Sequence, residues 1–219
     1  ISDGRELRSL EPLRALTGLR SLDIGDNMEL TDLNALSALT GLRKLRVANA
    51  DWSVKGTLPD LSGLTALEEL EAGEEDFAQF AACKSLKKLT LFMNRFGDSA
   101  DFTALAGLDQ LEELYLNFDR DDEKPVHIES LSALPALRKL TIVGEDGPLP
   151  LGAFPQVTDI TVIGNNIVEN LSTDALRIDP APDGENTALT RLTVIGFQGG
   201  LQIGGYESEI KDSAALSSL

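Results

Sequence analysis

The sequence predicts an α/β solenoid, a curved stack of similar coils with parallel strands on its concave face and short helices or 3₁₀ turns on its convex face. Two observations predict this fold. A six-residue pattern with apolar residues at its first, fourth and sixth positions recurs along the chain, and leucines spaced by three residues precede its copies. A single coil of this kind cannot bury its leucines alone, so neighbouring coils must stack.

The recurring pattern predicts eight strands. Alternating apolar residues are typical of a strand with one buried face, and the copies follow one another at intervals of 19 to 32 residues. We expect the fourth residue of each copy, from Leu22 to Leu192, to form one buried row. The copies are LRSLDI (19–24), LRKLRV (42–47), LEELEA (67–72), LKKLTL (86–91), LEELYL (111–116), LRKLTI (137–142), VTDITV (157–162) and LTRLTV (189–194).

A short helical turn is predicted before each strand. Upstream of the second strand, leucines stand at every third position: Leu30, Leu33, Leu36, Leu39 and Leu42. A step of three fits a 3₁₀ or short α turn whose apolar edge points at the strand. These turns would form the convex face of the stack.

In this repeat the chain resembles the leucine-rich repeat family, and the segment NMELTDLNALSALTGLRKLRV (27–47) is most similar to its internalin-like bacterial subgroup. The resemblance covers residues 7 to about 197 and concerns the fold much more than the function. The family has an asparagine in the turn after each strand, where it normally satisfies backbone groups. The turn positions here are Asn27, Asn94 and Asn165, which keep the asparagine, and Ala50, Glu75, Asp119, Glu145 and Phe197, which need other hydrogen-bond partners.

We expect a single leucine-rich repeat domain over residues 1–219, with repeats at about 7–197 and a C-terminal cap at 198–219. An open parallel sheet exposes unpaired backbone groups at its ends, so the ends need protection. No cap precedes Leu7, which aligns with Leu30, and we therefore expect a missing upstream segment.

The C-terminal part of the chain departs from the regular repeat. Residues 192–205 would form a hairpin that turns at Gly199-Gly200, and residues 207–219 would form a short covering helix. Residues 165–186, an insertion rich in Pro, Asp and Asn, would be either a loop or a degenerate extra repeat.

Side chains of alternating charge are predicted to form a row across the strands. The residue before the second anchor of each strand points away from the core. Each charge would lie roughly 4.8 Å from two opposite charges, which stabilises the stack modestly and specifies its register. The row is Ser21, Lys44, Glu69, Lys88, Glu113, Lys139, Asp159 and Arg191, and the preceding column, with a similar alternation, is Arg20, Arg43, Glu68, Lys87, Glu112 and Arg138.

Two further outward columns change character along the chain. Their N-terminal members are charged or small, whereas their C-terminal members are aromatic and aliphatic residues framed by threonines. Contiguous apolar surface tends to mark a binding site, and aromatic residues are frequent hot spots. We predict a protein-binding surface made of Phe92, Tyr115, Phe118, Thr141, Val143, Thr161, Ile163, Thr193 and Ile195, with Met93 beside it. The alternative is that capping loops or residues 165–186 cover these side chains.

The sequence offers little for catalysis or metal binding. His127 is the only histidine and lies in a predicted loop, and Cys83 follows the leucine spacing, which predicts a buried thiol. The acidic cluster Asp119, Asp121, Asp122 and Glu123 lacks the glycine and distal glutamate of a helix–loop–helix calcium site, so we expect a solvated loop. Phosphate-binding and nucleophile-elbow motifs are absent from the sequence. We expect no enzymatic activity, cofactor or metal.

The composition limits the partners. The 219 residues, 42% hydrophobic and 25% charged, carry a formal charge of −17, which disfavours nucleic acid and anionic membranes because both would repel the chain. We expect a non-enzymatic module that binds a protein or peptide on the concave face, and the resemblance to internalins implies bacterial adhesion or host contact. The alternatives are an acidic intracellular inhibitor or immunity-type protein that captures a basic partner, and a scaffold within a larger effector protein. The compartment stays open, because the N-terminus looks trimmed.

Overall fold

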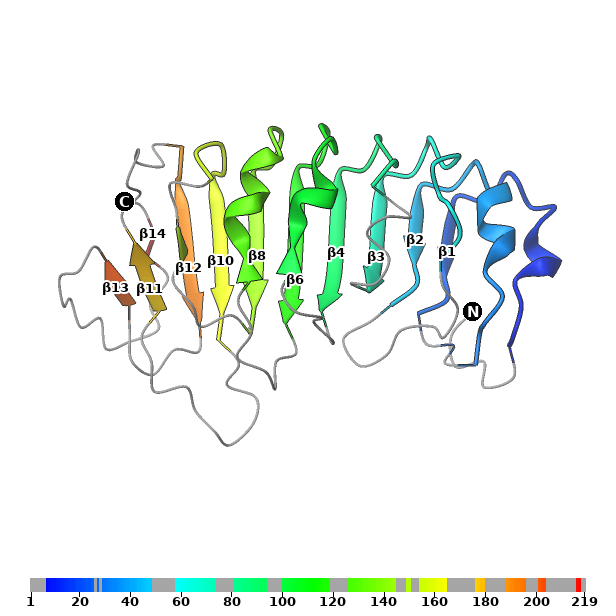
Figure 1. The fold of residues 1–219 in the computed structure, drawn as a ribbon, viewed down its shortest axis with the longest axis horizontal. Coiled ribbons are helices and arrows are strands. Elements are labelled where there is room, and N and C mark those ends of the chain that lie inside the picture. The colour runs from blue at the N-terminus through cyan, green and yellow to red at the C-terminus, as the bar shows by residue number, and fades with distance from the viewer. Residues whose placement is uncertain are drawn as a thin grey trace.

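The computed structural model describes residues 7–25, 27, 29–48, 58–73, 81–93, 100–118, 126–144, 149–150, 154–164, 176–179, 188–195, 201–203 and 216–217. Its main sheet has nine strands, of which the first eight run parallel and the last runs antiparallel to its neighbour. The sheet is open, and its first and last strands lie towards opposite ends of the molecule (Figure 1). The strands, in spatial order, are β1 (Ser21–Asp23), β2 (Lys44–Arg46), β3 (Glu69–Gly73), β4 (Lys88–Met93), β6 (Glu113–Phe118), β8 (Lys139–Val143), β10 (Asp159–Ile163), β12 (Arg191–Ile195) and β14 (Leu216–Ser217).

The inner face of the main sheet carries the predicted apolar row. The backbone register places Leu22 beside Leu45 and continues strand by strand to Ile160 beside Leu192. All members of this row are buried. The prediction of eight stacked strands with one shared apolar face is therefore confirmed.

Short 3₁₀ helices lie on the other side of this apolar layer, as the leucine spacing predicts. In the second coil the backbone N–H groups of Leu36, Leu39 and Leu42 each donate to the carbonyl of the leucine three residues earlier, at 2.9 Å. This turn geometry points every third side chain at the core, where these leucines are fully buried. The helices are η1 (Glu11–Leu13), η2 (Asn34–Ala38), η4 (Phe102–Leu105) and η5 (Ile128–Ala133).

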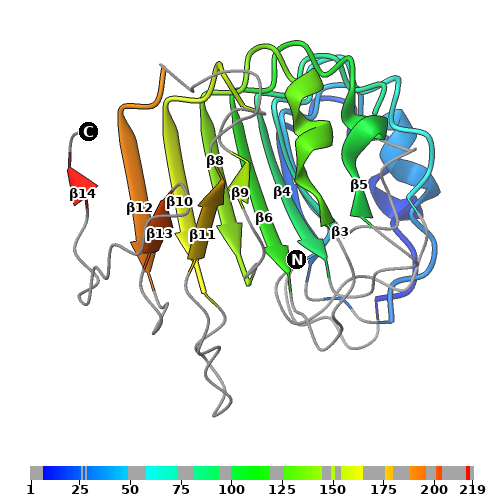
Figure 2. The same cartoon turned by 60° about the vertical axis from the view of Figure 1, so that its left-hand side comes forward.

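Two small parallel sheets share the helical side of the molecule. One pairs β5 (Ala100–Asp101) with β7 (Val126–His127). The other contains β9 (Leu149–Pro150), β11 (Leu176–Asp179) and β13 (Leu201–Ile203). In both ribbon views η5 and β11 lie over the same face of the main sheet, and Figure 2 shows β9 on that side too (Figures 1 and 2). The convex layer therefore changes from 3₁₀ helices to strands towards the C-terminus.

The C-terminal predictions were partly wrong. β13 does not pair back onto β12 as a hairpin, because it lies in the second sheet, parallel to β11. Residues 216–217, expected to be helical, form β14, which adds to the main sheet beside β12. The remainder of the predicted covering helix lies outside the described residues. Antiparallel addition of β14 gives part of the last parallel strand hydrogen-bond partners that a helix would not supply.

The insertion at residues 165–186 does not add a strand to the main sheet, since β10 pairs directly with β12. Its described part, Leu176–Asp179, is β11 of the second sheet. This described part belongs to the convex layer, and the rest of the segment lies outside the described residues.

The asparagine turn is described at Asn27, which is fully buried. Its Nδ2 donates to the carbonyl of Ile24 at 3.0 Å, and its own carbonyl accepts the N–H of Leu30. The side-chain amide thus satisfies one backbone carbonyl of the turn, as the family pattern implies, while the Leu30 N–H is bonded by the backbone carbonyl of Asn27. The equivalent positions of the later turns, from Ala50 to Phe197, lie outside the described residues.

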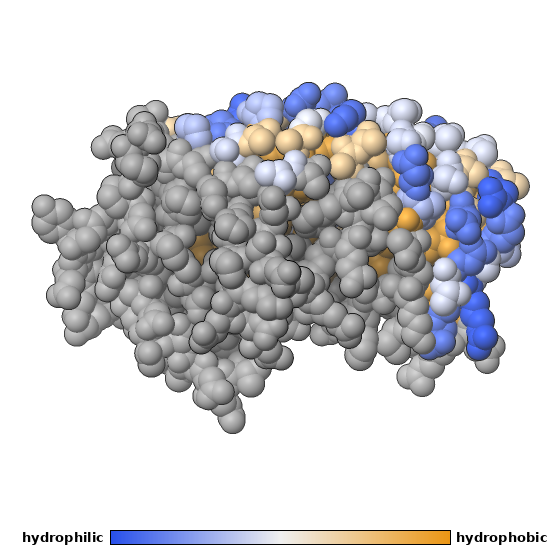
Figure 3. Space-filling model, in the orientation of Figure 1, coloured by the Kyte–Doolittle hydropathy of each residue, from blue (hydrophilic) through white to orange (hydrophobic). Residues whose placement is uncertain are grey.

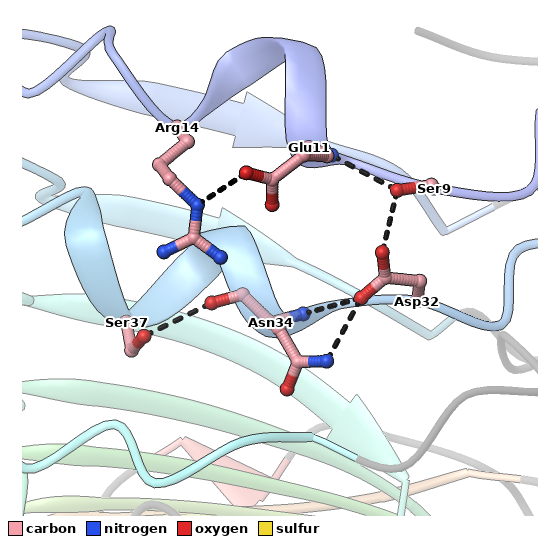
Figure 4. A network of polar contacts seen from close by, with 6 residues as sticks. All are labelled: Ser9, Glu11, Arg14, Asp32, Asn34 and Ser37. Carbon is pink, nitrogen blue, oxygen red and sulfur yellow. Dashed lines mark hydrogen bonds and ion pairs between the residues drawn. The ribbon is translucent and has the colours of Figure 1, made fainter.

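A polar network joins the first two coils on the helical side (Figure 4). Ser9 Oγ donates to Asp32 Oδ2 at 2.6 Å and accepts the N–H of Glu11, while Asp32 Oδ1 accepts both the N–H and the Nδ2 of Asn34. Glu11 in turn pairs with Arg14. The hydrogen bond from Ser9, followed by those from Asn34, lowers the pKa of Asp32. These bonds hold the first residues of η1 and η2 in place.

The space between the two layers is filled by leucine, isoleucine, valine and phenylalanine side chains. Seen from the helical side, described hydrophilic residues line the upper edge and the N-terminal end, with apolar residues between and behind them (Figure 3). Among the described residues, no helix combines the length and the hydropathy of a membrane span.

Candidate functional site

The face of the main sheet that points away from the hydrophobic core is called the outer face. A row of charges of alternating sign crosses this face. We call it the charge row, and the backbone register sets its members side by side on consecutive strands. Lys44 Nζ lies 2.7 Å from Glu69 Oε2, and Arg191 Nη1 lies 2.9 Å from Asp159 Oδ1. The row is Ser21, Lys44, Glu69, Lys88, Glu113, Lys139, Asp159 and Arg191.

Further ion pairs flank the charge row at its N-terminal half. Just before the strands, Arg43 Nη1 lies 2.6 Å from Glu68 Oε1. Two positions further along the strands, Arg46 lies between two carboxylates, 3.0 Å from Asp23 and 3.2 Å from Glu71. The sequence analysis did not predict this cluster of Asp23, Arg46 and Glu71. The alternating signs of these three residues at equivalent strand positions would have indicated it.

Two carboxylates of this face, Glu71 and Glu113, have pKa values that are shifted in opposite directions. Burial raises the pKa of Glu71 more than the nearby Arg46 lowers it. Partial burial also raises the pKa of Glu113, but the hydrogen bond from Lys88 and the charges of Lys88 and Lys139 outweigh it, so the net shift is downward. Glu113 therefore stabilises the fold at pH values above its unfolded pKa, and this contribution is lost as the pH falls through its folded pKa.

Reversing the charge of Glu113 is expected to destabilise the protein. Glu113 Oε2 lies 3.2 Å from Lys88 Nζ, and its Oε1 lies 3.5 Å from Lys139 Nζ. Glu113→Lys would replace two exposed attractions by two repulsions, at a cost of about 1–2 kcal/mol in urea unfolding at low salt. Added salt should shrink this cost, since exposed charges are screened.

Glu113→Gln is the matched control for this prediction. It removes the attraction without adding repulsion, so its cost should be smaller and should fade in acid, where the wild-type carboxylate is also protonated. A loss for Glu113→Lys that neither salt nor pH alters would contradict an electrostatic role for the row.

Beyond the charge row, the outer face of the C-terminal strands is uncharged. Two parallel rows of side chains cross β4, β6, β8, β10 and β12 here, and we call them together the uncharged stripe. One row carries hydroxyl groups and the other mostly aromatic and aliphatic groups. The first row is Thr90, Tyr115, Thr141, Thr161 and Thr193, and the second is Phe92, Asn117, Val143, Ile163 and Ile195.

The stripe contains eight of the nine residues predicted to bind a protein, and the structure brings these eight together. Their side chains are half-buried, apart from Ile195, which is 46% exposed. Partial burial raises the pKa of Tyr115. Within the described residues, the side chains of the stripe thus keep surface that a partner could contact.

Phe118 does not belong to this surface. Its side chain is 1% exposed and packs in the hydrophobic core. β6 alternates strictly between outward and inward residues from Glu113 to Phe118, so a residue three positions after Tyr115 must point inward. The same alternation was readable in the sequence. Met93 ends β4 beside Phe118, as expected from its position.

The structure also places the cysteine and the histidine that were candidates for catalysis or metal binding. Cys83 is buried, its thiol donates to the Leu61 carbonyl at 3.3 Å, and burial raises its pKa to about 11. His127 lies in β7 rather than in a loop, paired with Asp101. The acidic segment 119–123 lies outside the described residues. Within the described ranges, no three histidine, cysteine, aspartate or glutamate residues are placed to hold a metal ion.

Comparison of the sequence with protein-family models finds no match. A search of curated proteins also finds none.

Comparison with solved structures finds proteins of the leucine-rich repeat type. An internalin (inlF) from Listeria monocytogenes has a TM-score of 0.55 at 20% identity, over 92% of this chain and 65% of that chain. TLR13, solved in a complex with ssRNA13, has a TM-score of 0.56 at 22% identity, over 91% of this chain and 28% of that chain. The plant peptide hormone receptor RGFR1, solved with RGF2, has a TM-score of 0.50 at 18% identity, over 90% and 31%.

These similarities concern the fold. The chain spans 65% of the length of the internalin chain and 28% of the TLR13 chain. Together with the stacked strands and 3₁₀ turns, they show that this chain has the leucine-rich repeat fold.

Proposed function

Because the chain has the leucine-rich repeat fold, we propose that it is a non-enzymatic recognition module that binds a protein or peptide on the outer face of its main sheet. The uncharged stripe carries this proposal. It joins aromatic, aliphatic and hydroxyl side chains of five consecutive strands into one surface. Such surfaces tend to mark interaction sites, and a central aromatic residue such as Tyr115 is a typical anchor.

Proteins of similar fold support a role in recognition. RGFR1, a plant peptide hormone receptor, is solved with RGF2, whereas TLR13 is solved with an RNA. For this chain we propose a protein or peptide partner, since a formal charge of −17 opposes the approach of a polyanion. A bacterial adhesion or host-contact role is part of the proposal and follows from the internalin-like repeat.

The proposal is tested with a double variant, Tyr115→Ala with Val143→Asp. A phage-displayed random-peptide library is selected on the immobilised wild-type protein, and the affinity of the selected peptides is then measured for each variant. We expect the double variant to lose at least about tenfold in affinity, because it removes an aromatic anchor and places an unpaired charge in the contact. Thermal unfolding is measured alongside.

The matched control is Gln110→Ala with Ser132→Asp. Both of these residues are exposed and lie outside the strands of the main sheet, so the control should keep wild-type affinity. Equal binding by all three folded proteins, or a selection that enriches no peptide, would rule out the stripe as the binding surface.

A further inference from the structure

The net negative charge of the chain does not extend to the outer face of the main sheet. The outward positions of the eight parallel strands, with the residue just before each strand, carry nine basic and seven acidic residues, a balance of +2. The whole chain carries −17, which leaves −19 for all other positions. The basic residues are Arg20, Arg43, Lys44, Arg46, Lys87, Lys88, Arg138, Lys139 and Arg191, and the acidic ones are Asp23, Glu68, Glu69, Glu71, Glu112, Glu113 and Asp159.

Many charges on this face are already paired with each other. Lys44 pairs with Glu69, Asp159 pairs with Arg191, and Arg46 contacts two carboxylates at once. A charged group of a partner would have to compete with these pairs. The charge row therefore offers little net attraction to a partner of either sign.

The uncharged stripe lies directly beside the charge row, on the same strands. Its ten positions hold no Asp, Glu, Lys or Arg in a chain in which 25% of residues are charged. A partner charge brought against it would lose water and meet no opposite charge, which is costly. Hydroxyl groups at Thr141, Thr161 and Thr193 can instead exchange hydrogen bonds with neutral groups.

We infer that the partner presents an uncharged surface to the stripe: aliphatic or aromatic side chains against Val143, Ile163 and Ile195, and neutral hydrogen-bonding groups against the threonine hydroxyls. This inference rests on the proposed function and identifies the chemistry of its partner. The attraction between the acidic remainder of the chain and a basic protein acts outside the stripe. An acidic inhibitor that captures its basic partner on this face is thereby disfavoured.

The test introduces a charge of either sign at one stripe position. Thr161→Lys and Thr161→Glu are compared with Ser132→Lys and Ser132→Glu on η5, using the peptides selected on the wild-type protein. Both Thr161 variants should lose about tenfold or more in affinity, and both Ser132 variants should bind like the wild type. The selected peptides should be poor in Lys, Arg, Asp and Glu, and their association rate should change little between low and high salt.

The outcomes separate this inference from the proposed function. If Tyr115→Ala with Val143→Asp abolishes binding but one Thr161 variant binds more tightly, the partner is charged, and this inference fails while the proposed function stands. Selected peptides rich in one sign of charge, with an association rate that falls about tenfold in salt, would overturn the inference in the same way. If the double variant binds normally, both fail.

Discussion

Replacing Phe118 with alanine is expected to lower the free energy of unfolding by about 3–5 kcal/mol. Phe118 is among the largest fully buried side chains. It is the last residue of β6, its side chain points into the core, and its backbone lies beside Met93 of the neighbouring strand. Removal of the ring loses its burial and leaves a cavity that the stacked coils on both sides can close only in part. Urea unfolding followed by circular dichroism measures the loss.

Tyr115→Ala is the control on the same strand. Tyr115 points outward and is half-buried, so its removal should cost much less than that of Phe118. The peptides selected on the wild type should show the reverse order, with Tyr115→Ala impairing binding and folded Phe118→Ala retaining it. A Phe118→Ala protein that keeps its stability but loses the peptides would restore Phe118 to the binding surface and contradict its placement in the core.

Replacing Gly144 with alanine is the second large effect we expect. Gly144 directly follows β8 with φ of 81°, a left-handed conformation that costs a residue with a side chain about 1–3 kcal/mol. A Cβ there would also overlap the backbone carbonyl of Phe118, and this overlap can be relieved only by moving β6 and β8 apart. Strain of that kind costs about another 1–3 kcal/mol. We expect a total of about 2–6 kcal/mol in urea unfolding.

Gly18→Ala is the matched control for Gly144→Ala. A Cβ at Gly18 would have no atom within 4 Å, and its stability should stay within about 0.5 kcal/mol of the wild type. Gly144 N–H also donates to the Ile163 carbonyl at 2.8 Å, so the turn is held between β6 and β10. Equal stability of the two variants would show that the turn after β8 can open at little cost.

Much of the fold was readable from local pattern. The alternation of apolar residues placed Leu22 to Leu192 in one buried row, and the step of three leucines predicted the turn of η2. The order Lys88, Glu113, Lys139 was also readable, because equivalent residues of consecutive repeats occupy adjacent strands. Eight of the nine proposed binding residues lie together for the same reason. Phe118 was wrongly assigned to the binding surface. The alternation of outward and inward residues continues to the last residue of its strand and turns Phe118 into the core.

The C-terminal region was harder to predict. Gly199-Gly200 suggested a hairpin, and the residues after it suggested a helix, but β13 pairs with β11 and β14 pairs with β12. Of these four strands only β12 carries the repeat, and the sequences of β11, β13 and β14 lack it. Local propensity cannot select among the available sheet edges, because the choice depends on backbone groups left unpaired elsewhere in the molecule.

The sequence by itself determined which residues face the core and which neighbours they meet, because a repeating pattern converts position in a repeat into position in space. The tertiary structure alone decided how the stack ends, where the convex layer turns from 3₁₀ helices into strands, and how tightly Gly144 approaches Phe118. The physical reason is that the core-facing residues follow from a pattern within each coil, and this pattern is repeated along the chain. The end of the stack, the change in the convex layer and the Gly144 turn follow from contacts between coils that differ in sequence.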